Sequence, residues 1–82
     1  MKDLKDTVDL MNSDDFKDRF KAEYYQTKIR YDKLHTMIVK YEAGTLPFTP
    51  SCSLELLKHQ ASMMSQYLYD LEVRAEIEKV EL

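Results

Sequence analysis

Residues 16–44 read FKDRFKAEYYQTKIRYDKLHTMIVKYEAG, and this stretch decides the fold. Its apolar and aromatic side chains recur in steps of three and four, broken only by one threonine, which is the spacing of one helix face. We therefore predict a helix over about residues 14–43, capped by Asn12 or Ser13 and ended by Gly44 in the left-handed conformation. The face consists of Phe16, Phe20, Tyr24, Thr27, Tyr31, Leu34, Ile38 and Tyr41.

The segment after this helix contains both prolines of the chain. Pro47 and Pro50 prevent the helix from continuing and favour extended or turn geometry. Residues 44–52 are therefore predicted to form a loop, in which Leu46 and Phe48 fold back over the end of the helix.

A second helix is predicted over about residues 53–79, capped by Ser51 or Cys52. Its apolar residues recur in strict steps of three and four, the heptad pattern of a coiled-coil seam. The members of this seam are Leu54, Leu57, Ala61, Met64, Leu68, Leu71 and Ala75.

Two long helices joined by a short loop are expected to lie antiparallel. The sequence thus predicts an all-α protein: an antiparallel, coiled-coil-like two-helix hairpin over residues 13–82, with residue 24 roughly opposite residue 72. Residues 1–12 form a separate N-terminal segment, in which apolar residues at one-turn spacing favour a short additional helix.

Both long helices carry a second, patchier apolar stripe that a lone hairpin leaves exposed. Apolar surface of this extent usually marks an interface, so we expect a homo-oligomer. Substitution of Met63 or Leu56 by glutamate is expected to weaken assembly more than a change at Lys33. The exposed apolar residues are Ile29, Val39, Leu56, Met63, Tyr67 and Ile77.

Composition excludes several classes of protein. One glycine and two prolines in 82 residues are too few for the turns of an all-β fold. One cysteine and two histidines close neither a disulfide nor a structural zinc site. The first ten residues lack the apolar core of a signal peptide, and no apolar run approaches the about 20 residues of a membrane span. We expect a protein of the host cytoplasm that needs no metal or cofactor and binds no membrane.

No pattern in the chain predicts catalysis. There is no glycine-rich phosphate loop, no paired histidine motif and no nucleophile elbow. Cys52 and His59 lie about two helical turns apart, so a cap or loop role is favoured for the cysteine over a nucleophile. The predicted protein is therefore not an enzyme.

The charge and the tyrosines instead favour the binding of a small anion. Residues 21–41 carry five basic and two acidic side chains, whereas residues 42–82 carry three basic and seven acidic. Tyrosine rings stack on bases, and lysine and arginine bind phosphates. The net charge of -3 disfavours binding of bulk nucleic acid. The candidate ligand-binding residues are Lys21, Tyr25, Lys28, Tyr67 and Arg74, and a second subunit would close the pocket that they form. The alternative is that Arg74 forms a salt bridge between subunits and that the tyrosines pack around it. Tyr31 is expected to be core.

Two stretches resemble a known group of proteins. The first helix, with Lys28-Ile29-Arg30 and Lys33-Leu34, and the pattern Leu56, Leu57, Gln60, Met64, Tyr67, Leu71 in the second are similar to a family of small phage and prophage helical hairpins first named from crAss-like phages. The resemblance covers about residues 14–78. In architecture the chain is more distantly similar to anti-CBASS sponges, which bind cyclic oligonucleotide signals.

These resemblances imply a phage-encoded, non-enzymatic anti-defence protein. The first hypothesis is an oligomeric sponge that sequesters a nucleotide-derived immune signal, such as a cyclic nucleotide or an ADP-ribose-type molecule. The alternatives are an inhibitor that binds a host defence nuclease in the manner of an anti-CRISPR through its acidic second helix, and a structural coiled-coil adaptor.

Overall fold

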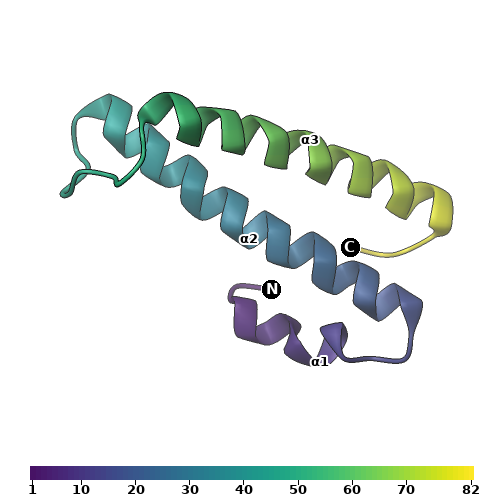
Figure 1. Ribbon diagram of the computed structural model, residues 1–82. Helices are drawn as coiled ribbons and strands as arrows, with labels where there is room; N and C mark the ends of the chain where they lie inside the picture. The colour runs from purple at the N-terminus through teal and green to yellow at the C-terminus, as the bar shows by residue number, and fades with distance from the viewer.

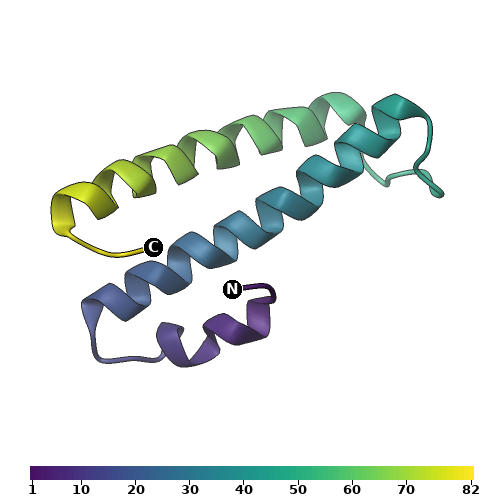
Figure 2. The same ribbon diagram turned by 180° about the vertical axis from the view of Figure 1, so that it is seen from behind.

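The computed structural model describes all 82 residues, and every regular element in it is helical (Figure 1). A 3-10 turn η1 (Leu4–Thr7) leads into the one-turn helix α1 (Val8–Met11). The long helices α2 (Phe16–Ala43) and α3 (Leu54–Glu78) follow and lie antiparallel. The predicted hairpin and short N-terminal helix are thus confirmed. Figure 2 shows the molecule from behind, with α2 between α3 and the N-terminal segment.

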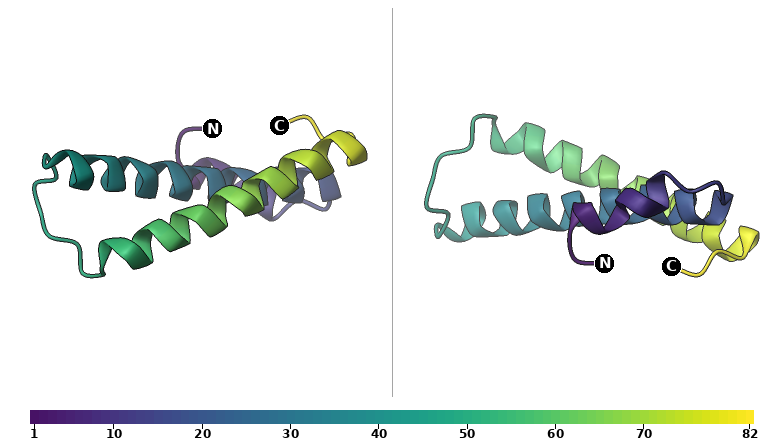
Figure 3. Two further views of the ribbon diagram at one scale, coloured as in Figure 1. Left: turned by 90° about the horizontal axis from the view of Figure 1, so that it is seen from above. Right: turned by 90° about the horizontal axis from the view of Figure 1, so that it is seen from below.

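The seam between the long helices is the one that the heptad pattern predicts. All seven predicted seam residues of α3 are buried or half-buried. Burial is deepest toward the open end of the hairpin, where Leu71 is only 1% exposed. Figure 3 shows the two helices crossing toward this end and diverging toward the loop. The core cluster consists of Phe20, Tyr24, Leu68, Leu71, Ala75 and Val80.

The helix N-termini differ from prediction by one to three residues. The N-cap of α2 is Asp15, whose Oδ1 accepts a hydrogen bond from the Lys17 backbone N–H at 3.0 Å. Asn12 and Ser13 were the wrong choice, because the Ser13 hydroxyl instead donates to Asp18 at 2.8 Å. Loop geometry before the helix thus selects the cap among several suitable residues.

The N-cap of the second helix also lies one or two residues later in the chain than the predicted Cys52 or Ser51. Ser53 is the N-cap of α3, and its Oγ accepts from the Leu56 backbone N–H at 3.2 Å. Ser51 and Cys52 lie in the loop before it. Gly44 ends α2 with φ 78°, as predicted, because glycine adopts the left-handed region without a side-chain clash.

The N-terminal segment covers the back of α2, the side away from α3. Thr7 is fully buried there; its Oγ1 donates to the Leu4 carbonyl at 2.7 Å and accepts from Gln26 Nε2 at 2.9 Å. Ala22 and Ile29 share the helix face of Gln26 and are buried, at 2% and 7% exposure. The expectation that Ile29 stays exposed was wrong, because residues 4–11 pack over this face.

The other apolar residues outside the seam that were expected to stay exposed are exposed. On α3 they range from 41% exposed at Tyr67 to 73% at Ile77. These exposed residues are Val39 on α2 and Leu56, Met63, Tyr67 and Ile77 on α3.

Neither long helix contains an apolar stretch of the length and hydropathy that crossing a bilayer requires.

Candidate functional site

A groove runs along one flank of the hairpin, between α2 and α3. It consists of two adjoining hollows, of about 280 and 330 Å³, that share Tyr31 and Ser65. We call it the Tyr31 groove. Residues three and four positions apart lie on one side of a helix, so α2 and α3 each supply a row of side chains. The polar and aromatic lining comprises Lys28, Tyr31, His35 and Glu42 from α2, and Lys58, Ser62, Ser65, Tyr69 and Glu72 from α3.

Aromatic rings line the middle of the groove. Tyr31 and His35 are stacked, with ring centroids 5.7 Å apart and an interplanar angle of 16°. Lys28 Nζ lies 5.9 Å from the centroid of the Tyr31 ring. Tyr69, from α3, is 65% exposed and lines the same hollow as Tyr31. Exposed aromatic faces of this kind can stack on a planar base.

The lysines of the groove are paired with carboxylates at the surface. Lys28 Nζ lies 3.1 Å from Asp32 Oδ1, and Lys58 Nζ lies 3.4 Å from Glu42 Oε1. All four side chains are about half exposed. Exposed pairs contribute little free energy, so an incoming phosphate can exchange for the carboxylate at low cost.

Glu72, which lines one end of the groove, accepts a hydrogen bond across the hairpin. Tyr24 Oη donates to Glu72 Oε2 at 2.7 Å. Burial and this carboxylate raise the pKa of the Tyr24 phenol well above its ordinary value. The phenol therefore remains a neutral donor at neutral pH.

Three of the five predicted ligand-binding residues lie on α2. Lys28 lines the Tyr31 groove. Tyr25 is half-buried and packs edge-to-face on Tyr24, with ring centroids 5.1 Å apart. Lys21 lies one turn before Tyr25 and is partly exposed. The three share one face of the helix because they are spaced four and three residues apart.

The other two predicted residues lie on the opposite flank of the hairpin. Arg74 Cζ is 4.9 Å from the centroid of the Phe20 ring, and Arg74 Nε donates to Glu78 Oε2 at 2.7 Å. This bond raises the pKa of the guanidinium. Tyr67 lies seven residues before Arg74 on the same side of α3. Within one chain, the structure therefore does not bring Tyr67 and Arg74 to Lys28.

Sequence reasoning missed Tyr69, His35 and Ser65 as lining residues. Tyr69 is two positions from Tyr67, so the two rings project on opposite sides of α3. The signal in the sequence was the spacing of Ser62, Ser65 and Tyr69, which lie three and four residues apart and therefore share one side of α3. Tyr31, expected as core, is half-buried: it packs on the core cluster and also lines the groove.

The largest hollow of the molecule is acidic. It has a volume of about 690 Å³ and lies where the C-terminal residues turn back from α3 (Figure 1). Glu72, Glu76 and Glu81 line it, with Lys79 as the single basic residue. Its charge disfavours a phosphate ligand. No group of three or more histidine, cysteine or acidic side chains is arranged to hold a metal ion.

The fold defines a small helical-hairpin protein with a surface groove between its long helices. The chain belongs to the Sequestin family, whose model matches residues 14–77, which is the hairpin without the N-terminal segment. The family name indicates the sequestering of a small molecule or partner, and hence a binding role. Comparison with curated proteins and with solved structures found no match.

Proposed function

We propose that this chain is a phage-encoded, non-enzymatic anti-defence protein that sequesters a nucleotide-derived immune signal. The observation that carries this proposal is the Sequestin match over residues 14–77. It is the hairpin itself that matches, so the sequestering role belongs to the part of the chain that contains the Tyr31 groove.

The side chains of the groove suit such a ligand. A base would stack on the exposed ring of Tyr69 or against the Tyr31–His35 pair. Lys28 would exchange Asp32 for a phosphate, and Ser65 would supply a hydroxyl that donates or accepts. A sponge needs binding alone, and stacking together with ion pairing provides it without a nucleophile.

Self-association would enlarge the site. The exposed apolar residues of α3, among them Met63 and Tyr67, suit burial against a second copy. Such an assembly could place Tyr67 and Arg74 of one chain near Lys21, Tyr25 and Lys28 of another. The five residues predicted from sequence would then form one pocket across the subunit boundary.

Binding is tested by calorimetry with a panel of cyclic dinucleotides, cyclic trinucleotides and ADP-ribose derivatives. At least one member should bind, and should raise the melting temperature as its concentration exceeds Kd. Tyr69→Ala is the groove variant, and Tyr67→Ala removes a matched ring on the opposite flank. Loss of binding in Tyr69→Ala alone supports the groove within one chain.

The other outcomes are equally informative. Loss of binding in Tyr67→Ala with the assembly intact supports the pocket across two subunits instead. Absence of any binding in the panel rejects the sponge. The nuclease-inhibitor hypothesis, which the acidic hollow near Glu76 and Glu81 favours, then predicts capture of a defence nuclease and its inhibition.

A further inference from the structure

A pocket of about 370 Å³ lies between α2 and the loop that follows it. Lys33, Thr36, Met37 and Lys40 line it from α2, and Leu46, Pro47 and Phe48 line it from the loop. Lys33, Thr36 and Lys40 are spaced three and four positions apart, so they form one row along the helix. The prolines turn the loop back so that its apolar residues face this row.

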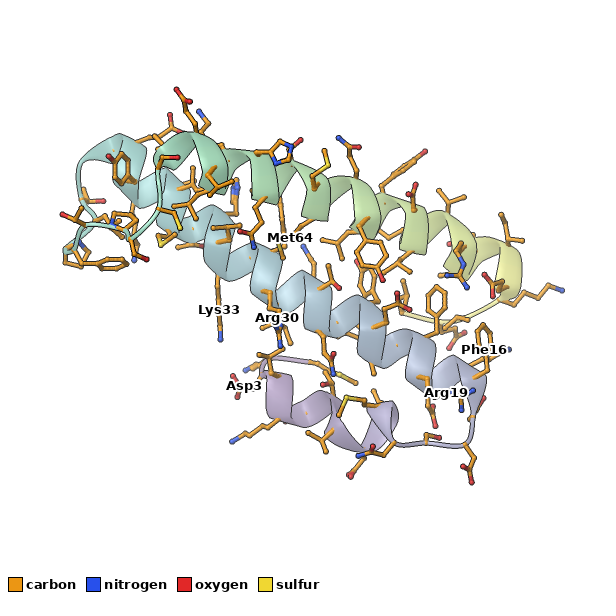
Figure 4. All side chains as sticks on the ribbon, in the orientation of Figure 1. Asp3, Phe16, Arg19, Arg30, Lys33 and Met64 are labelled. Carbon is orange, nitrogen blue, oxygen red and sulfur yellow. The ribbon has the colours of Figure 1, made fainter.

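The only charged residues of this pocket are two lysines, Lys33 and Lys40. Neither Lys33 nor Lys40 forms an ion pair, and no carboxylate lines the pocket. In Figure 4 the Lys33 side chain points away from α3, and Arg30 extends from the preceding turn of α2 toward the start of the chain, where Asp3 lies. The lysines of the Tyr31 groove are neutralised by carboxylates, whereas these two are free to bind an anion.

An apolar wall faces the two lysines. Phe48 is 57% exposed, although its neighbour Leu46 is half-buried against the end of the hairpin. Thr36 supplies a hydroxyl between the two lysines. Two free ammonium groups, one hydroxyl and one exposed ring match a phosphate ester that carries a planar group.

We propose that this pocket is a binding site for a phosphomonoester attached to a planar ring, of the mononucleotide class. Lys33 and Lys40 hold the phosphate, and Phe48 covers the ring. The pocket is separate from the Tyr31 groove. Lys33 is two positions from both Tyr31 and His35, so it projects from the opposite side of α2. The proposal therefore does not depend on the sponge function.

The test is a titration of the full chain, labelled with ¹⁵N, with AMP, ribose 5-phosphate and inorganic phosphate. AMP should shift the amides of Lys33, Thr36, Met37, Lys40, Leu46 and Phe48, and should bind more tightly than ribose 5-phosphate, because only AMP carries a planar ring for Phe48. Inorganic phosphate should bind most weakly. Equal affinity for AMP and ribose 5-phosphate would overturn the role of Phe48, and no shift in these residues with any probe would overturn the site.

Two variants and a matched control locate the interaction. The double variant Lys33→Gln, Lys40→Gln should weaken AMP binding at these amides by about tenfold or more, since two charge-assisted contacts are lost. Phe48→Ala should reduce the preference for AMP over ribose 5-phosphate. The matched control, Lys5→Gln with Lys17→Gln, removes two charges from exposed residues that line neither site and should leave these shifts unchanged. Unaltered affinity in the double variant would reject the proposal even if a signal molecule binds the groove.

Discussion

Tyr24 Oη donates a 2.7 Å hydrogen bond to Glu72 Oε2, joining residues 48 positions apart in the chain. The bond sets residue 24 opposite residue 72, which is the register expected for an antiparallel hairpin that turns near Phe48. It lies beside the deepest part of the core, where Leu71 and Ala75 are buried. This polar contact thus joins the same two helices whose seam is apolar, in the register that the seam predicts.

Removal of this hydroxyl should destabilise the hairpin without opening a cavity. Tyr24→Phe is expected to lower the free energy of unfolding by about 1–2 kcal/mol, because the lost bond has a charged acceptor. Urea denaturation at neutral pH measures the change. Tyr69→Phe removes a hydroxyl for which the structure shows no hydrogen bond, and should change little; equal losses in both variants would contradict the role of the Tyr24 bond.

The burial of the Tyr24 phenol, together with this bond, makes stability depend on pH in the alkaline range. The pKa of Tyr24 is raised in the folded protein, so its contribution is complete below the unfolded pKa of about 10 and is lost as the pH rises through the folded pKa. The wild type should therefore lose more stability between pH 9 and pH 11 than Tyr24→Phe. Parallel urea curves for the two proteins over this range would contradict the assignment.

The packing of the N-terminal segment depends on a buried threonine. Thr7→Val keeps the shape of the side chain but removes the hydroxyl that bonds Leu4 and Gln26. We expect a loss of about 1–2 kcal/mol and faster amide hydrogen exchange in residues 4–11. Thr49→Val in the exposed loop is the control. Unchanged exchange in Thr7→Val would show that the segment is held by other contacts.

The long helices could be predicted because their spacing and stop signals are local. The seven seam residues of α3 were identified from heptad spacing alone, and Gly44 marked the end of α2 correctly. The cover on Ile29 was not predicted, because the apolar spacing in residues 4–11 indicates a short helix but not the face of α2 on which it packs, where Gln26 Nε2 donates to both Thr7 Oγ1 and Met11 Sδ. The periodicity of two amphipathic helices predicts how they pack on each other, but it does not predict where a third element that buries a threonine packs.

The candidate site could be predicted only in part. Lys28 was identified from the charge of its helix, and it lines the groove. Tyr69 was missed because it does not belong to the second apolar stripe of α3. Tyr67 does belong to that stripe, and it projects from the other side of the helix. Lys33, which we expected to lie outside the assembly interface, is exposed, and it also lines a pocket with Phe48. That pocket depends on the path of the loop, which prolines restrict but do not determine.

Tyr31 is expected to contribute to both stability and binding. Its half-buried ring packs on the core, so Tyr31→Ala should cost about 1–2 kcal/mol, less than the about 3 kcal/mol expected for the buried Tyr24→Ala. The variant should also lose signal binding at a temperature where it is still folded. Thermal melts and calorimetry on the same samples separate the two effects. A stable Tyr31→Ala protein with full binding would move the site away from the groove.

Assembly should depend on the exposed side of α3. Met63→Glu places a charge in the apolar stripe and is expected to shift the protein toward a 9.8 kDa monomer in light scattering. Thr49→Glu adds the same charge in the loop and should not. A wild type that is already monomeric at micromolar concentration would contradict the oligomer, and an unchanged mass for Met63→Glu would place the interface elsewhere.

The most direct measurement asks whether the protein holds a signal without consuming it. The full chain is incubated with the member of the nucleotide panel that it binds most tightly, the free concentration is measured by mass spectrometry after filtration, and the protein is then heat-denatured. Sequestration predicts a free concentration that falls in proportion to the protein added and returns, as intact molecule, after denaturation. A signal that stays free throughout, or one that is recovered as a cleaved product, would contradict it.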